Sequence, residues 1–282
     1  MKIIPLAADS MGSRSMAVFV ETRDAKIIVD PGAAVVPLRF GLSPHPLEKW
    51  QLQKHADRIR LFTESARTVV ITSYHSDHFT ADRPEWLKNK VLIVKNPNQR
   101  TTPVERKAAF NFLKTAKTVA SEILFADGRT FTVGSAEIGF SPSCSSGQEF
   151  FIGMFIRSDE RSFLFSSNAQ GPASDEAANW LENQQAEFLY LDGPVTYLQK
   201  RTESLTTTLD RMMRVVLRIG AKDILLDHHP LRDLNWKKHL EPFFRFGSEN
   251  GLRIRTAAEY RGEESAPLEA RRNLLYQDPR SQ

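Results

Sequence analysis

Cysteine is almost absent from this sequence, since Cys144 is the only one in 282 residues. A lone thiol cannot close a disulfide within the chain, so a reducing cytoplasm is the expected compartment. Long hydrophobic runs are also missing, and no stretch reaches the ~18 apolar residues that predict a membrane span. The first residues lack the apolar region and the small-residue cleavage site of a secretory signal. We therefore expect neither membrane insertion nor export.

A dense block of one charge is likewise lacking. The sequence has 38 Lys and Arg against 34 Asp and Glu, and this net charge of +4 is spread along the chain. Neither a basic stripe interleaved with aromatic residues nor an RNA-binding motif is present. A nucleic-acid-processing or nucleic-acid-binding role is therefore a weak alternative, and a solvated surface of mixed charge explains the composition better.

Repeats, low-complexity segments and linkers are absent as well. Short apolar runs alternate with longer amphipathic stretches, which favours a layered α/β protein whose sheets are covered by helices. The expected strands are 2–7, 15–21, 26–30, 68–72, 91–94, 130–133, 137–141, 150–157, 162–166, 188–191, 224–227 and 253–255. The expected helices are 46–67, 104–121, 174–183, 202–219 and 236–250. We assign residues 1–262 to a single domain and residues 263–282 to a polar C-terminal tail.

The sequence does contain a compact group of side chains that can bind metals. His75, Asp77 and His78 follow directly after the β-branched run at 68–72. Imidazole and carboxylate groups are common ligands of Zn, Fe and Mn in proteins. A buried strand that ends just before these residues provides a rigid support on which a site can be preorganised.

A second pair of histidines, His228 and His229, also follows an apolar run, at 224–227. Two strands that end in histidine, far apart in the sequence, fit one shared site, and either histidine of the pair could be the ligand. The isolated His55 and His239 are predicted to lie on helix surfaces. His45, which stands between two prolines, is predicted to be structural or to lie at the rim of the site.

Together these features resemble the metallo-β-lactamase superfamily: a strand followed by Asp-Pro-Gly at 30–32, a strand followed by a His/Asp cluster, and a C-terminal strand followed by histidine. More narrowly, the chain is similar to an uncharacterised, mostly archaeal family of predicted metallo-hydrolases. The segments that carry this narrower resemblance are 12–17 (GSRSMA), 19–22 (FVET), 41–48 (GLSPHPLE), 170–172 (QGP), 192–194 (DGP) and 227–229 (DHH). The resemblance extends over nearly the whole chain, from residue 3 to about residue 240.

The resemblance implies a four-layer αββα sandwich. It also implies a site for two metal ions, usually Zn, with a bridging hydroxide that attacks an ester, an amide or a phosphodiester. The first metal would use two histidines of an H-x-H-x-D-H motif, a later histidine and a bridging aspartate. The second metal would use the aspartate and the last histidine of that motif, the bridge and a C-terminal histidine.

Several positions of this sequence match the superfamily's ligand pattern. His75, Asp77 and His78 match the H-x-H-x-D-H motif from its second histidine onward. His228 matches the C-terminal histidine, with His229 as the competing choice. The resemblance therefore assigns Asp77, His78 and His228 to the second metal.

Other positions depart from the pattern. The first histidine of the motif falls on Ser73, the later histidine on Ser146, and the bridging aspartate on Asn168. Serine hydroxyls are poor metal ligands, and Asn168 offers a neutral amide oxygen in place of a bridging anion. A catalytic zinc usually takes three protein ligands, and His75 is the only one that the first site keeps. We therefore expect the first site to be empty.

Two interpretations of these residues stay open. In the first, the protein is a hydrolase with at most one metal, Zn or alternatively Mn or Fe, and it acts on an ester or a phosphodiester. Asp77 and His75 would then be catalytic, and His75, freed from ligation, would act as general base or acid. In the second, the protein is metal-free and inactive, and it binds a small ligand or a partner. The sequence leaves the substrate and the oligomeric state open.

Four further residues have two interpretations each. Arg14 could direct its guanidinium at the site or form a structural ion pair. Asp192 and Asp227 could each orient a ligand histidine or simply form a turn. Cys144 could replace a lost ligand, although a buried and inert thiol is the expected case.

Overall fold

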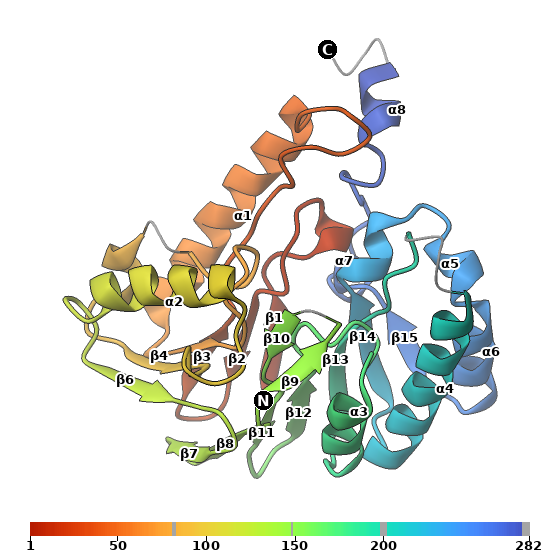
Figure 1. The fold of residues 1–282 in the computed structure, drawn as a ribbon. Helices are drawn as coiled ribbons and strands as arrows, with labels where there is room; N and C mark the ends of the chain where they lie inside the picture. Colours follow the sequence, from red (N-terminus) through yellow and green to blue (C-terminus); the bar gives the residue numbers. More distant parts are fainter. Residues whose placement is uncertain (81–82, 148, 198–201, 278–282) are drawn as a thin grey trace.

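The computed structural model describes residues 1–80, 83–147, 149–197 and 202–277, and two large mixed sheets form its centre (Figure 1). The N-terminal sheet has the strand order β1-β2-β3-β4-β5-β6. The first three strands pair antiparallel, whereas β3 to β6 run parallel. The bounds are β1 Lys2–Pro5, β2 Val18–Glu21, β3 Lys26–Val29, β4 Thr68–Ile71, β5 Val91–Val94 and β6 Glu122–Phe125.

The C-terminal sheet has the strand order β15-β14-β13-β12-β11-β8-β7. Strands β12 to β15 run parallel, and the others pair antiparallel. A separate hairpin, formed by β9 and β10, lies beside this sheet near the centre of Figure 1. The bounds are β7 Thr130–Val133, β8 Ala136–Phe140, β9 Cys144–Ser146, β10 Glu149–Phe151, β11 Met154–Arg157, β12 Ser162–Phe165, β13 Phe188–Asp192, β14 Asp223–Asp227 and β15 Arg253–Arg255.

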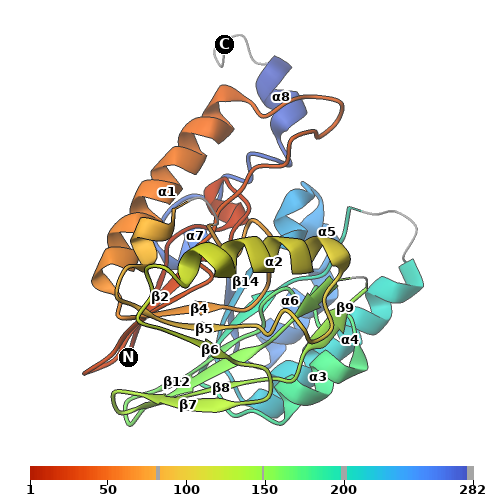
Figure 2. The ribbon, with the colours of Figure 1, turned by 60° about the vertical axis from the view of Figure 1, so that its left-hand side comes forward.

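Helices cover the outer face of each sheet (Figures 1 and 2). The N-terminal sheet is covered by α1 (Pro46–Ser65) and α2 (Pro103–Ala116), and the C-terminal sheet by α3 (Asp175–Glu182), α4 (Thr202–Ile219) and α6 (Glu241–Glu249). The shorter helices are η1 Asp9–Met11, η2 Pro84–Leu87, η3 His229–Arg232, α5 Trp236–His239, α7 Ala257–Tyr260 and α8 Arg272–Gln277. None of the helices in the described ranges is long and apolar enough to span a membrane.

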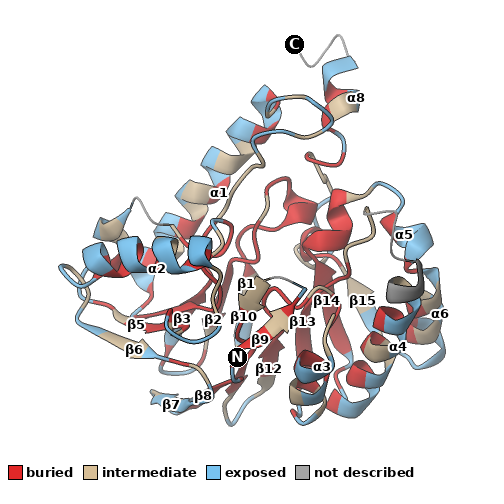
Figure 3. Cartoon of the chain, in the orientation of Figure 1, coloured by how far each residue is buried: buried red, intermediate tan, exposed pale blue. Residues whose placement is uncertain are grey.

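Three hydrophobic clusters hold these layers together. One lies between the sheets and joins residues such as Val70 and Ile93 to Phe163 and Tyr190. The other two lie between each sheet and its helices, and the buried strands contrast with the exposed outer faces of the helices in Figure 3. The expected four-layer αββα sandwich is thereby confirmed.

The run Thr-Val-Val-Ile of β4 illustrates why the sequence forms this architecture. Each of its residues is buried, because helices cover one face of the sheet and the second sheet covers the other. A parallel strand that is buried on both faces needs a continuous apolar run and not an alternating one. The end of such a strand is held firmly by its neighbours, and the His/Asp cluster lies in the segment that follows it.

Several predicted elements differ from the observed ones. The helix expected at 104–121 ends at Ala116, and a turn leads to β6 (Glu122–Phe125), which the sequence did not predict. The strand expected at 150–157 divides into β10 and β11. Between them, Gly153 passes so close to Trp180 that a Cβ would lie 2.4 Å from its ring. The helix expected at 236–250 divides at Leu240, because Pro242 begins a new helix there and cannot donate a backbone hydrogen bond.

The prediction that His55 lies on a helix surface was wrong. Its side chain is fully buried on α1, where Nδ1 lies 2.6 Å from Ser13 Oγ and Nε2 lies 2.8 Å from Gln51 Nε2. The α1 helix is covered on that side by the segment around Ser13, a tertiary contact that helical periodicity does not reveal. His45 is structural, as one of its two interpretations held, because its ring accepts a hydrogen bond from Leu47 at the start of α1.

The segment after α7 returns to the N-terminal half of the chain. Arg272, at the start of α8, is fully buried and forms a two-pronged ion pair with Glu48 of α1, at 2.8 Å for each contact. It also donates to the carbonyls of Leu42 and Val36. The C-terminal segment thereby fixes the loop that leads into α1, and α8 lies beside that loop in Figure 1.

Candidate metal centre

The candidate site lies where strands of both sheets end. β4 is followed by the His75–His78 segment, β12 by Asn168, and β14 by His228. Since the carboxyl ends of parallel strands meet at one edge of a sheet, the layered fold brings these distant segments together. On one side of the site, the backbone of Gly32 packs directly against that of Phe79. A Cβ at position 32 would lie 2.2 Å from the backbone nitrogen of Phe79.

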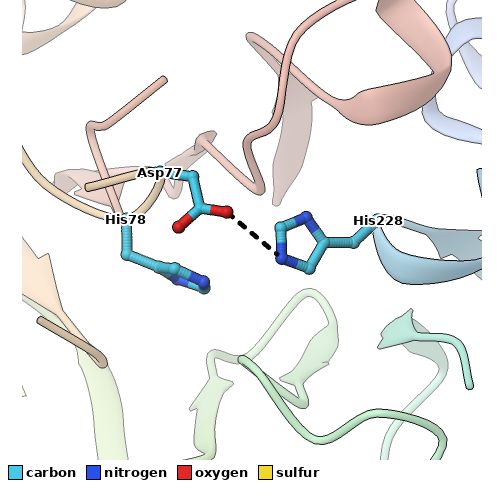
Figure 4. A group of neighbouring side chains, drawn as sticks. All are labelled: Asp77, His78 and His228. Atoms are coloured by element: carbon cyan, nitrogen blue, oxygen red, sulfur yellow. Dashed lines mark ion pairs between the residues drawn. The ribbon is translucent and has the colours of Figure 1, made fainter. Parts of the chain in front are cut away.

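Asp77, His78 and His228 form a buried group, and their candidate ligand atoms all lie within 4.8 Å of one another. His228 Nε2 lies 3.7 Å from Asp77 Oδ2 (Figure 4). In the figure, the Asp77 carboxylate and the His78 ring lie on the same side of the His228 ring. His78 Nε2 is buried and has no hydrogen-bond partner in the described part of the chain. An unpartnered buried nitrogen is costly unless a ligand or an ion completes it.

A carboxylate lies at the Nδ1 atom of both His78 and His228. His78 Nδ1 lies 2.7 Å from Asp30, and His228 Nδ1 lies 2.8 Å from Asp9. Metal-binding histidines usually donate one ring N–H to a carboxylate, which fixes the ring and leaves the other nitrogen for the metal. These contacts are therefore the arrangement that a metal centre requires around its ligands.

His229, the competing candidate, is held in the same way. Its Nδ1 lies 2.9 Å from Asp192 Oδ1, and Asp192, His228 and His229 form a second group that could hold a metal. The structure thus supports an orienting role for Asp192. Asp227 accepts instead from the backbone N–H groups of Ser10, His228 and Ala257, so it holds the surrounding loops and touches no histidine ring in the described chain.

The backbone at the site is strained. His228 has φ 72° and ψ −112°, and Asp30 has φ 47°, values that residues with a side chain rarely adopt. A short hydrogen bond of 2.7 Å from His228 N to Asp227 Oδ1 holds the first of them. Strained residues of this kind gather at functional sites, where the surrounding structure over-determines them.

His75 lies apart from the two groups that could hold a metal. Its Nε2 is 3.2 Å from Glu105 Oε1 and 3.8 Å from Glu149 Oε1. Burial acts to lower the pKa of His75, but the neighbouring carboxylates outweigh it and raise the pKa above its ordinary value. Among the described residues, His75 shares no metal-binding group with Asp77 or His78.

The positions that depart from the superfamily's pattern are buried and polar. Ser73 Oγ, Ser146 Oγ and Asn168 Oδ1 have no hydrogen-bond partner in the described ranges. Asn168 donates its amide N–H to Glu149 Oε2 at 2.8 Å, so the amide nitrogen is occupied and the oxygen is left. Serine and amide oxygens are neutral and poor metal ligands, whereas Asp77, His78 and His228 form a group that could hold a metal ion.

Arg232 is a site residue that the sequence did not predict. It is buried, and its Nη2 lies 3.3 Å from Asp77 Oδ2 and 3.2 Å from His228 Nε2, while its Nε donates to Asp9 at 2.8 Å. Burial acts to raise the pKa of Asp9, but Arg232 and His228 outweigh it and lower this pKa to about 2. The only signal in the sequence was its place four residues after His228.

A small cavity of about 150 Å³ opens onto this centre. Glu149 of β10 borders it and was also missed, because nothing in its local sequence marks it. Its carboxylate accepts hydrogen bonds from Asn168 and Gln170, so a negative charge remains beside the position of the expected bridging aspartate. Arg14 also borders the cavity, but both arms of its guanidinium bind Glu269, at 2.5 and 2.7 Å.

Cys144 belongs to neither group that could hold a metal. It is buried in a small cluster with Phe151, Ala169 and Ala177, and its Sγ contacts the carbonyl of Pro142 at 3.4 Å. Burial raises the pKa of this thiol to about 11. The expected inert thiol agrees with this environment, because a thiolate is the form that binds metals.

Comparison with known proteins identifies relatives of this chain and of its fold. No family model matches it. In structure it is similar to the metallo-β-lactamase fold protein YhfI of Bacillus subtilis, with a TM-score of 0.53, 17% identity and coverage of 80% of this chain and 84% of that one. It is also similar to Tm1679, a metal-dependent hydrolase of the β-lactamase superfamily, with a TM-score of 0.50, 11% identity and coverage of 90% and 94%. At these identities the likeness establishes the fold alone.

The sequence relatives are closer. A UPF0282 protein of Korarchaeum cryptofilum is 36% identical over 98% of this chain and 95% of its own length. UPF0282 proteins of Metallosphaera sedula and Methanocaldococcus jannaschii are 34% and 31% identical, each over 98% of this chain and 93% and 97% of their own lengths. The chain therefore belongs to the UPF0282 family, whose members here come from archaea, and it has the metallo-β-lactamase fold.

Proposed function

We propose that this protein is a hydrolase that uses one metal ion, held by Asp77, His78 and His228. The observation that carries this proposal is the arrangement of the side chains at and around these three residues. The three ligand atoms lie within 4.8 Å of one another, and Asp30 and Asp9 hold the two rings at Nδ1. Two histidines and one carboxylate suit Zn, and also Mn or Fe.

A bound Zn²⁺ acts as a Lewis acid and makes water a stronger nucleophile at neutral pH. The residues of the chain supply the rest of the chemistry. Glu105, buried at the start of α2, lies 3.2 Å from His75 Nε2 beside the cavity, where this ring can take up or give a proton. Arg232 places a positive charge next to Asp77, which suits a substrate or a transition state that carries negative charge.

Metal content tests this proposal directly. Protein purified without chelator is expected to contain about one metal per chain, and Asp77→Ala and His78→Ala are expected to lose it. Asp57→Ala is a matched control, because this exposed carboxylate on α1 lies outside both candidate groups. Two metals per chain would contradict the argument from Ser73, Ser146 and Asn168.

Hydrolysis tests the enzymatic part. We expect slow cleavage of a generic ester or phosphodiester by the loaded protein, and its loss in His78→Ala. His75→Gln is expected to lower kcat while the metal content stays at the wild-type level, because His75 lies outside the ligand group. Loss of metal in His75→Gln would place this histidine among the ligands instead.

One observation favours a second candidate function, a metal-free binding protein. Arg232 Nη2 already lies within 3.3 Å of two of the three proposed ligand atoms, so a cation is present at the centre without any metal. In that case the protein would contain no metal under any loading condition. It would also keep its stability in the presence of a chelator, whereas a metal protein would lose stability.

A further inference from the structure

A larger cavity, of about 630 Å³, adjoins the candidate metal centre. Arg232 borders both this cavity and the smaller one, and it is the same guanidinium that reaches Asp77. Sites for small molecules usually have volumes of about 300–1,000 Å³. The cavity therefore has the size and the position to hold the part of a substrate that is not cleaved.

The charged residues that border this cavity are mainly cationic. Arg39, Arg232 and Lys238 contribute positive charges. Arg232 pairs with Asp9 and Asp77, and Arg39 lies 3.9 Å from Glu269, a carboxylate that it shares with Arg14. Asp233 adds one carboxylate to the lining, and it lies 3.4 Å from His239 Nε2. Lys238 is exposed and has no ion-pair partner among the residues that the structure describes.

Buried polar atoms without partners border the same cavity. Arg39 Nε, Thr196 Oγ1 and Asn273 Oδ1 have no hydrogen-bond partner in the described chain, and these residues come from three distant segments. Buried polar groups are nearly always satisfied, so several orphaned atoms at one cavity indicate a missing ligand. The arginine N–H can only donate and the threonine hydroxyl can donate, whereas Asn273 Oδ1 can only accept. A ligand that completes all three therefore offers acceptors and one donor.

Aromatic rings fix the direction of the Arg39 side chain. Its guanidinium carbon lies 4.9 Å from the centre of the Phe40 ring and 4.8 Å from that of Tyr197. Such contacts restrain a flexible cation. Leu205 and Leu234 add apolar surface to the same wall. The lining therefore suits a molecule that carries an anionic group on an apolar body.

We propose that this cavity binds an organic phosphate, with the phosphate group held by Arg39 and Lys238. Binding of this molecule needs no metal. The inference rests on the proposed function only where it takes the bound molecule to be the substrate. It narrows the open substrate class to anionic phosphate esters. Arg232 would then lie between the bound anion and the proposed metal ligands.

The test is binding of phenyl phosphate to the chelator-treated protein, measured by calorimetry. Lys238→Gln and Arg39→Gln are each expected to weaken binding by about tenfold, the usual effect of losing one charge-assisted contact. Lys237→Gln is the matched control, because this neighbouring lysine pairs with Glu259 and borders a different cavity. It is expected to change the affinity by less than twofold, and phenol, which lacks the anion, is expected not to bind.

Equal weakening by Lys237→Gln would show attraction to general surface charge and would overturn the proposal. Binding of phenol as tight as that of phenyl phosphate would overturn it as well, and so would a lack of binding. Lys238 is exposed, so Lys238→Gln tests the cavity even if Arg39→Gln fails to fold. Binding is measured on chelator-treated protein and does not depend on metal. If protein purified without chelator contains no metal, the proposed hydrolase is refuted and this binding result still stands.

Discussion

Asp30 and His78 form a fully buried hydrogen bond, with 2.7 Å between Oδ2 and Nδ1. The same carboxylate accepts from the backbone N–H and the hydroxyl of Thr72, at 2.7 and 2.5 Å. Asp30 thus joins the end of β3 to the loop after β4 and turns Nε2 of His78 toward the proposed centre. In the proposed centre, the Asp-Pro-Gly segment would therefore act by orienting His78 and not by binding the metal itself.

Asp30→Asn is expected to weaken Zn binding by about 10–100-fold, the usual effect of losing a carboxylate that orients a ligand histidine. The affinity can be measured by competition with a coloured chelator. Asp24→Asn is the control, because this exposed carboxylate binds Ser135, which is not part of the proposed centre. An affinity equal to that of the unchanged protein would show that Asp30 does not act on a metal ligand.

Much of the fold could be predicted from the sequence, because the strands that decide it carry strong local signals. The continuous apolar runs at β4 and β14 are buried on both faces, and this pattern is typical of parallel strands between two covering layers. The ends of α1, α2 and α3 were predicted less well than their presence. β6 was missed because its residues are only partly buried, so no clear periodicity marks them.

The candidate site could be predicted only in part. His78 and His228 follow their strands directly, and this local feature made them visible. Arg232 and Glu149 act through contacts that the fold creates: Arg232 lies 155 positions from Asp77, and Glu149 lies 19 from Asn168. The burial of His55 has the same cause, since Ser13 lies 42 positions away. Spacing within one segment carries no information about such partners.

His55 is expected to make the stability of the protein depend on pH. Burial lowers the pKa of His55 in the folded protein to about 3, from 6.5 in the unfolded chain. Below pH 6.5 the unfolded chain therefore binds a proton that the folded protein refuses, and the free energy of unfolding falls as the pH falls toward 3. At pH 5 this effect lowers the free energy of unfolding by about 2 kcal/mol.

Urea denaturation at pH 7 and pH 5 measures this effect. His55→Gln is expected to lower the free energy of unfolding at pH 7. It is also expected to remove most of the further decrease in that free energy between pH 7 and pH 5. His239→Gln changes an exposed histidine and is expected to leave the pH dependence as it is. If both variants lose stability with pH as the parent does, another group is responsible.

Cys144 is expected to be unreactive in the folded protein. Its thiol is buried, and a pKa of about 11 leaves roughly one molecule in a thousand as thiolate at pH 8. A coloured disulfide reagent should therefore report no fast-reacting thiol in native protein and one thiol per chain after addition of guanidinium. Rapid reaction without denaturant would show that the loop from Ser141 to Gly147 opens readily.

The ion pair of Arg272 with Glu48 is expected to hold the C-terminal segment in place. Arg272→Ala should lower the free energy of unfolding by about 3–5 kcal/mol, because it leaves the buried carboxylate of Glu48 without its partner. Arg60→Ala is the matched control, since Arg60 pairs with Glu64 on the surface of α1, the helix that carries Glu48. Loss of this surface pair should lower the free energy of unfolding by at most about 0.5 kcal/mol. The double variant Arg272→Ala, Glu48→Ala should lose less than the sum of the two single changes, because it removes both charges together. If Arg272→Ala is no more harmful than Arg60→Ala, the charged tail is not anchored by this pair.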